Sequence, residues 1–175
     1  FTTGFARAED HASGKAGYLK SATYYSDDWV INFWNSESSR MDEELAQIAE
    51  DGFNNIILVV PWREFQPGTS PCTYNSYAWD KLDRVMAADQ GLSVMLRGGY
   101  TWDYYGRDDV LSRYRGLMYD GDIRDAWMEY VGRLYGRASS HGNFCGGFIT
   151  WEDFWNFTDT SAGLGNKASA RKMAR

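Results

Sequence analysis

The 175-residue sequence predicts an α/β fold, specifically a (β/α)8 TIM barrel of which this chain supplies roughly the first four βα units. Three observations lead to this prediction. Apolar segments typical of strands alternate with segments of helical periodicity, and this order requires right-handed crossovers and a parallel sheet. The segment after the first expected strand, 35–38, is not the glycine-rich phosphate loop that a doubly wound sheet normally carries. A complete barrel needs roughly 200 residues or more, so four units make about half of one.

The N-terminal part of the sequence predicts an extension, a strand and a helix. Residues 1–28 lack a clean period and are expected to form an N-terminal extension, with the half-barrel occupying residues 29–175. The first strand is expected at residues 30–34, which are rich in β-branched and aromatic side chains. A helix is predicted from Met41 to Gly52, because apolar residues recur there at helical spacing and glycine commonly ends a helix.

The remainder of the chain continues the alternation of apolar strands with helices that have one apolar face. The expected elements are a strand at 55–60, a helix at about 79–86, a strand at 92–96, a helix from its cap Asp122 to 138, a strand at 147–151 and a helix at 166–175. Half a barrel leaves two open sheet edges and an unclosed core. We therefore expect a complementary C-terminal half of the barrel, in the same protein or in a second chain, as a partner.

Composition excludes several classes of partner. With 24 acidic residues against 18 basic ones the net charge is −6, and an acidic surface repels phosphate backbones, so no nucleic acid is expected. No apolar run approaches the ~18 residues that a membrane span requires. The two cysteines, Cys72 and Cys145, and the two histidines, His11 and His141, show no metal-ligand spacing. The sequence predicts neither a metal site nor a cofactor.

The aromatic content points toward a carbohydrate partner. Tryptophan, tyrosine and phenylalanine make up 17% of the chain, and several of these residues stand among Gly, Asp and Pro in expected loops. The flat apolar faces of sugars stack well on such rings, so an oligosaccharide or polysaccharide ligand is expected. For any single ring, packing within the loop is an equally good explanation.

Candidate site residues follow from the rule that barrel enzymes carry their chemistry at the C-terminal ends of the strands. Arg63 and Arg97 stand at two such ends and are expected either to hold substrate or to form structural ion pairs. The candidates for substrate binding are Trp34, Trp62, Arg63, Arg97, Tyr100, Trp102, Trp151, Asp153 and Trp155.

Glu152 is the candidate catalytic carboxylate. It directly follows the last expected strand and is flanked by Trp151 and Trp155. Apolar surroundings raise the pKa of a carboxyl group toward the value that a general acid needs. A solvated loop acid is the alternative explanation for Glu152, and Asp153 could hold the catalytic role instead.

Several short segments resemble the clan A retaining glycoside hydrolases, which include cellulase-like and β-galactosidase-like families. The segments are Val60-Pro61-Trp62, Gln66-Pro67-Gly68, Tyr74, Trp79-Asp80-Lys81-Leu82-Asp83 and Gly91-Leu92-Ser93-Val94, together with a glutamate after the fourth strand. The resemblance covers residues 30 to about 155 and is one of pattern. It implies that Glu152 is the acid/base carboxylate, and that the nucleophile ends a seventh strand that this chain does not contain.

One departure from the family pattern leaves other functions open. Trp151 stands where the family usually has an asparagine that contacts the sugar 2-hydroxyl. The alternatives are a non-catalytic carbohydrate-binding or scaffold barrel and a different barrel enzyme, such as a lyase or isomerase. The last is weakened because the sequence shows no phosphate loop, no lysine at a strand end and no histidine cluster.

Overall fold

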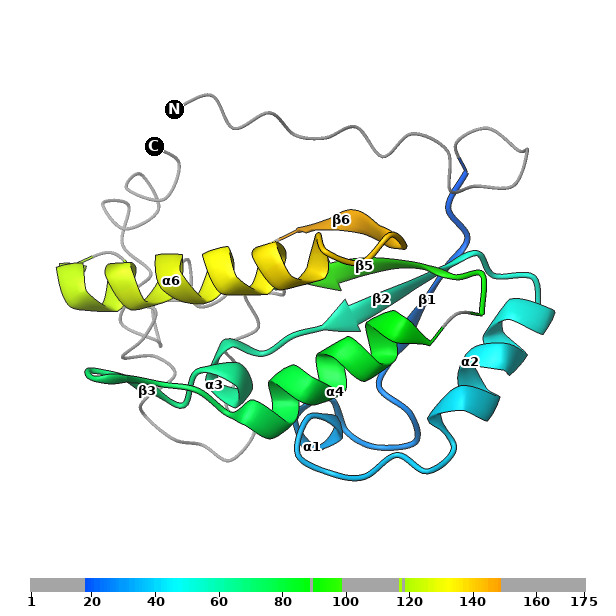
Figure 1. Ribbon diagram of the computed structural model, residues 1–175, viewed down its shortest axis with the longest axis horizontal. Coiled ribbons are helices and arrows are strands. Elements are labelled where there is room, and N and C mark those ends of the chain that lie inside the picture. The colour runs from blue at the N-terminus through cyan, green and yellow to red at the C-terminus, as the bar shows by residue number, and fades with distance from the viewer. Residues whose placement is uncertain (1–17, 89, 99–116, 118, 149–175) are drawn as a thin grey trace, which may run out of the picture.

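The computed structural model describes residues 18–88, 90–98, 117 and 119–148, except for the side chain of Ile31. Its centre is a four-stranded sheet in which every neighbouring pair is parallel (Figure 1). The strands follow one another across the sheet in chain order: β1 (Ser21–Tyr24), β2 (Asn55–Val59), β5 (Ser93–Arg97) and β6 (Phe144–Phe148).

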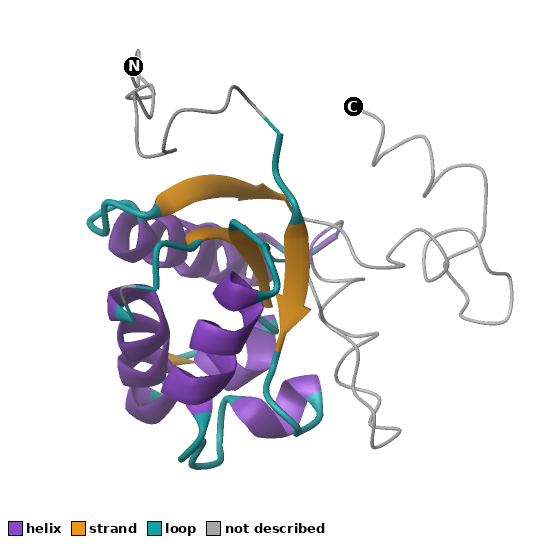
Figure 2. Cartoon of the chain, turned by 90° about the vertical axis from the view of Figure 1, so that its right-hand side faces the viewer, coloured by secondary structure: helices purple, strands orange, loops and turns teal. Residues whose placement is uncertain are grey.

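The long helices lie on one side of this curved sheet (Figure 2). They are α2 (Met41–Glu50) after β1, α4 (Ser76–Ala87) after β2 and α6 (Gly121–Ala138) after β5. Right-handed crossovers that always step in the same direction place all helices on one face, as in a barrel, whereas a doubly wound sheet reverses direction and covers both faces. The α/β class and the parallel sheet predicted from the sequence are therefore confirmed.

Three β-to-α units and a fourth strand are described. The predicted helix at 166–175 lies outside the described residues. Short elements lie in the connections that follow β1 and β2. The connection after β1 contains α1 (Val30–Phe33), and the one after β2 contains α3 (Trp62–Phe65) and a hairpin of β3 (Gly68–Thr69) and β4 (Cys72–Thr73). No helix of the described part is both long enough and apolar enough to cross a membrane.

The two faces of the sheet differ in burial. Alternate strand residues on the helix side pack into one apolar core with the inward-facing residues of the helices. This core includes Ile56, Leu58, Val94, Leu96, Leu45, Leu82 and Leu134. On the opposite face, Ile57 and Met95 are only partly buried and Thr23 is exposed. In a closed barrel this second face lines the interior.

The strand predicted at residues 30–34 is wrong. Val30–Phe33 is the short helix α1, and the first strand is β1, which lies inside the range predicted as an N-terminal extension. Val30, Phe33 and Trp34 are all at most 1% exposed, so the buried positions follow the i, i+3, i+4 spacing of a helix. Burial of these three side chains outweighs the β-propensity of the segment.

The predicted end of α2 is correct, but the predicted N-cap of α6 is not. The predicted end of α2 is confirmed, because Gly52 has a φ of 81° and its N–H bonds to the carbonyl of Ala49 at 3.0 Å. The cap of α6 is Asp120 and not Asp122, because the Oδ1 of Asp120 accepts from the backbone N–H of Asp122 at 2.9 Å.

An ion pair between α4 and α6 makes the stability of the fold dependent on pH. Arg137 donates from Nε to Oδ1 of Asp83 at 2.8 Å and from Nη2 to Oδ2 at 2.5 Å. The arginine lowers the pKa of Asp83, with desolvation opposing it. A carboxyl group with a lowered folded-state pKa stabilises the fold above its unfolded pKa of roughly 3.9 and loses this contribution as the pH falls.

We therefore expect Arg137→Gln to lower the melting temperature at pH 6, and we expect the difference from wild type to shrink toward pH 2.5. Thermal melts across this range provide the measurement. Arg40→Gln is the matched control, because Arg40 and Glu43 are 67% and 79% exposed and their pair is loose, at 3.8 Å. A melting-temperature difference between Arg137→Gln and wild type that stays constant with pH would contradict the contribution of the Asp83–Arg137 pair.

Candidate functional site

The C-terminal ends of the four parallel strands meet at one edge of the sheet, which we call the catalytic edge by analogy with barrel enzymes. Val59, Arg97 and Phe148 end β2, β5 and β6 and lie side by side in register. Val59 does not join the main core but packs with Val30 and Tyr25, which shows that this row faces away from the long helices.

Arg97 is thus placed at the catalytic edge, on the face that would line a barrel interior. Its guanidinium carbon lies 5.6 Å from the centre of the Phe148 ring, and the side chain is partly buried. An arginine held against an aromatic ring keeps its donors in a fixed plane, which suits it to bind hydroxyl or carboxylate oxygens. Arg63, in α3, is also partly buried and follows the end of β2.

Trp34 does not lie at a strand end. Its ring is 0% exposed, packs edge-on against Phe33 and Phe65, and donates from Nε1 to the carbonyl of Val59 at 2.8 Å. This correction follows from the first: once residues 30–33 are helical, Trp34 falls at the C-terminal end of that helix and turns into the core. The side chain fastens α1 to β2 and is not available to a sugar.

Trp62 is also a core residue and not a ligand-facing one. It is 0% exposed, its ring centre lies 4.8 Å from that of Trp127, and it stacks on Tyr130 at 6.4 Å. Its Nε1 donates to Oε1 of Gln66 at 2.6 Å, and Gln66 in turn donates to the carbonyl of Ala126 at 3.1 Å. Trp62 therefore joins the loop after β2 to α6.

Glu152 and most of the other predicted site residues lie outside the described residues. These are Tyr100, Trp102, Trp151, Asp153 and Trp155. The described strand β6 is Phe144–Phe148, so it begins three residues earlier than the strand predicted at 147–151. Gly147 fixes this placement in part, since a Cβ there would lie 2.5 Å from both the carbonyl of Leu96 and the hydroxyl of Tyr135 on α6.

A polar group at the catalytic edge was not predicted as a site. Glu64 in α3 accepts from Nδ2 of Asn35 at 2.5 Å, and Oδ1 of Asn35 accepts from Nδ2 of Asn75 at 2.9 Å. These contacts tie together the segments after α1, after β2 and before α4. No periodic pattern pointed to these contacts, because the three residues lie in irregular or short segments far apart in the chain.

Lys81 anchors the segment that carries Asn35. It is 2% exposed, and its Nζ donates to the carbonyls of Phe33 and Ser36 and to Oγ of Ser38. Burial lowers the pKa of Lys81, while nearby Glu37 acts in the opposite direction. All three ammonium hydrogens have acceptors, so this buried cation rigidifies residues 33–38.

An aromatic residue at the catalytic edge was missed. Trp29 follows β1 and is 42% exposed, and Tyr25, which immediately follows the strand, is its ring neighbour at 6.5 Å. The signal that could have found it is the run Tyr24-Tyr25-Ser26-Asp27-Asp28-Trp29, where two aromatics flank a polar turn. That signal was hidden because the first strand was expected after Trp29 and not before it.

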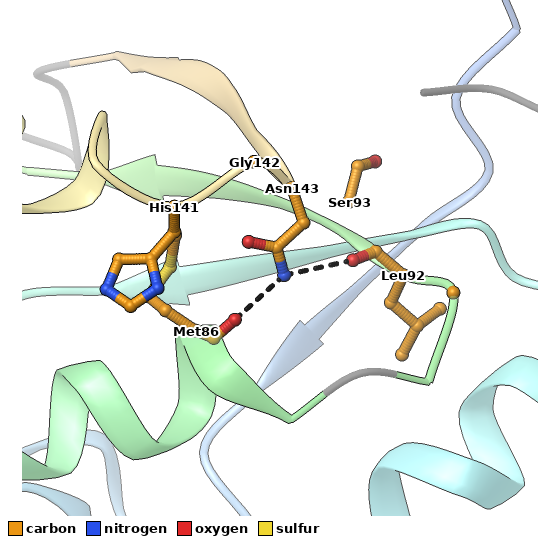
Figure 3. Close-up of a pocket in the computed structure, with 7 residues that line it drawn as sticks. Met86, Leu92, Ser93, His141, Gly142 and Asn143 are labelled. Carbon is orange, nitrogen blue, oxygen red and sulfur yellow. Dashed lines mark hydrogen bonds between the residues drawn. The ribbon is translucent and has the colours of Figure 1, made fainter. Parts of the chain in front are cut away.

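A hollow of about 350 Å³ lies at the opposite, N-terminal edge of the sheet (Figure 3). Asn143 occupies its wall and donates from Nδ2 to the carbonyls of Met86 at 3.0 Å and Leu92 at 3.4 Å. These bonds join the segment before β6 to the C-terminal end of α4 and to the residue before β5. Barrel residues at this end serve stability and not chemistry, so the hollow is not the candidate site. Across the described ranges, His, Cys, Asp and Glu side chains form no cluster of three suited to a metal ion.

A scan against protein-family models gives no match, and neither does a search of curated proteins. Solved structures do match. A GH5_18 from Bifidobacterium longum subsp. infantis superposes with a TM-score of 0.70 at 19% identity, over 89% of this chain and 38% of that one. A glutamate-to-alanine variant of GH5_18 from Bifidobacterium longum subsp. longum, in complex with Manb1-4GlcNAc, gives 0.70 at 18% identity, over 90% and 38%. GH5_18 from Streptomyces cattleya, in complex with GlcNAc, gives 0.58 at 20% identity, over 75% and 33%.

These similarities show a shared fold. The neighbours are glycoside hydrolases of GH5, a TIM-barrel family of clan A, which is the clan that the sequence resembles. The chain spans little more than a third of their length.

Proposed function

We propose that this chain is the N-terminal part of a glycoside hydrolase that cleaves O-glycosidic bonds with two carboxylates, of which Glu152 is the acid/base. One observation carries the proposal. A parallel sheet wound like that of the GH5_18 hydrolases is followed, shortly after its fourth strand, by a glutamate between aromatic residues. The clan A resemblance assigns the acid/base carboxylate to this position.

Glu152 would act twice in a retaining reaction. It first donates a proton to the leaving oxygen while a second carboxylate attacks the anomeric carbon and forms a covalent glycosyl-enzyme. It then accepts a proton from the water that hydrolyses this intermediate. The two carboxyl groups of such an enzyme lie ~5–5.5 Å apart. Trp151 and Trp155 flank Glu152 in the sequence and would raise its pKa by excluding water, as an acid catalyst requires.

The second carboxylate belongs, in this proposal, to a complementary C-terminal segment that closes the barrel. The described sheet supports this arrangement, because its second face is only partly buried at Ile57 and Met95. At the described strand ends that face presents Val59, Arg97 and Phe148, none of which can act as a nucleophile.

An oligosaccharide is the proposed substrate. Two of the neighbours were solved with Manb1-4GlcNAc and GlcNAc. Arg97 and Arg63 would contact the ligand from the described strand ends, and Tyr100, Trp102, Trp151, Asp153 and Trp155 would contribute from the segments beyond them. Trp34 and Trp62 have no part in this proposal because both are fully buried.

The test is hydrolysis by the complete protein, with Manb1-4GlcNAc and a panel of aryl glycosides as substrates and with ¹H NMR of the first product. We expect hydrolysis with retention of the anomeric configuration. Inversion would mean a carboxyl separation of ~6.5–9.5 Å and a different role for Glu152. Disaccharide binding without any hydrolysis would favour the non-catalytic carbohydrate-binding barrel.

A further inference from the structure

The segment between β1 and α1 holds two aromatic rings at the catalytic edge. Tyr25 and Trp29, which together we call the aromatic platform, have ring centres 6.5 Å apart and an interplanar angle of 63°. Tyr25 packs against Val30 and Val59, while the Trp29 side chain stays 42% exposed. The Tyr25 ring is therefore held within the protein, while part of the Trp29 side chain stays accessible to solvent.

The backbone of the platform is held in place by hydrogen bonds. Trp29 is the N-cap of α1, with its carbonyl accepting from the N–H of Phe33 at 2.9 Å. Its own N–H donates to Oδ1 of Asp28 at 2.8 Å, and the other oxygen of Asp28 accepts from Oγ of Ser36 at 2.6 Å. The Ser36 hydroxyl is the main cause of the lowered pKa of Asp28, so this carboxylate stays ionised. A ring carried on such a backbone loses little freedom when a ligand binds.

The turn itself is unusual. Ser26 is the single non-glycine residue of the described part with a positive φ, 59°, and its hydroxyl donates to Oε2 of Glu44 at 2.7 Å. Sparsely populated backbone conformations persist where surrounding contacts impose them, and they gather near binding and catalytic sites. The turn directs the chain from the strand end to Trp29.

Charge near the platform narrows the choice of ligand. Asp27 is exposed and Asp28 is partly buried and ionised, and both directly precede Trp29. Adjacent carboxylates repel phosphates and other anions, but they accept hydrogen bonds from hydroxyl groups. An exposed indole beside hydroxyl acceptors matches a pyranose ring, which has an apolar face and polar edges.

We infer that Trp29, backed by Tyr25, is a stacking platform for one ring of a neutral oligosaccharide bound along the catalytic edge. The inference rests on the proposed function for the identity of the ligand. It assigns a sugar-binding subsite to the segment after β1, next to the end of β2. In this inference Trp29 contributes to the affinity for longer substrates and takes no part in bond cleavage.

The test measures binding of Manb1-4GlcNAc and of a longer oligosaccharide, cellotriose, by calorimetry. The complete protein carries Glu152→Gln so that neither ligand is consumed. Trp29→Ala and Trp29→Leu are each expected to weaken the affinity for at least one ligand about 10-fold, because both remove the flat ring. Trp29→Tyr keeps a ring and should retain most of the affinity. Tyr18→Ala is the matched control, since Tyr18 is 80% exposed beyond the other end of the same strand, and it should change nothing.

Several outcomes are decisive. Trp29→Leu with wild-type affinity for both ligands overturns the inference, and so does the absence of binding to the parent protein at millimolar ligand. If Trp29→Ala fails to fold, the Leu and Tyr variants still separate stacking from packing. The proposed function can fail independently of this inference. If the protein hydrolyses no glycoside but Trp29→Leu still lowers its affinity for the disaccharide, the stacking platform is supported and the proposed catalysis is wrong.

Discussion

Replacing Glu152 with Gln in the complete protein is expected to lower turnover of a natural glycan roughly 10²- to 10⁴-fold while folding stays intact. Glutamine keeps the shape of the side chain but cannot donate a proton to the leaving oxygen. Substrates whose leaving groups need no proton should be spared in the glycosylation step. The measurement is kcat on Manb1-4GlcNAc compared with kcat on a glycoside of a good leaving group such as dinitrophenol.

Asp153→Asn is the matched control for this experiment, because it makes the same chemical change one residue along the chain. It should leave turnover within a few-fold of wild type. If Asp153→Asn abolishes turnover and Glu152→Gln does not, the acid/base role moves to Asp153. If neither variant affects hydrolysis, catalysis does not depend on this segment and the assignment is wrong.

Replacing Trp62 with Ala is expected to destabilise the fold by about 3–5 kcal/mol, in the range for large aromatic side chains removed from a core. Trp62 is fully buried, and the change removes its contacts with Trp127 and Tyr130 and its hydrogen bond to Oε1 of Gln66. For a domain of this size, such a loss lowers the melting temperature by roughly 6–20 °C. Thermal and urea melts of the same protein provide the measurement.

Trp62→Phe separates packing from hydrogen bonding, since it keeps an aromatic ring but loses the N–H group. It should cost clearly less than the alanine variant. Trp29→Ala is the comparison for exposure, because it removes the same side chain from a position that is 42% exposed. A melting temperature unchanged by Trp62→Ala, together with a loss of sugar binding, would contradict the core placement and restore Trp62 as a ligand-facing residue.

The elements that the sequence predicted well are those whose burial pattern is continuous and local. The apolar run at 55–60 becomes β2, and the helical spacing after Met41 becomes α2. In both, the residues on the core-facing side, such as Ile56, Leu58 and Leu45, meet the same core, so the pattern of side chains and the environment agree. The helix end at Gly52 was also predicted correctly, because the ability to adopt a positive φ depends on that single residue.

The elements that were misassigned lack such a pattern. The first strand, Ser21–Tyr24, is four residues long and includes the polar residues Ser21 and Thr23, so no continuous apolar run marks it. Residues 30–34 suit a strand by propensity but fold as α1, because Val30 packs on Val59 while Phe33 and Trp34 enter the main core. At the fourth strand, the prediction began three residues too late, at Gly147 and not at Phe144.

By itself the sequence determined the α/β class and the alternating order of strands and helices, whereas Glu152 as the catalytic carboxylate stays a prediction. The class and the order follow from the spacing of apolar residues and the succession of segments, both of which can be read directly from the sequence. The tertiary structure alone decided that the sheet winds in one direction with its long helices on one face, that Trp34 and Trp62 are core residues, and that Trp29 faces solvent at the catalytic edge. The exposure of a ring depends on which distant element packs against it, and a local sequence pattern does not show that contact.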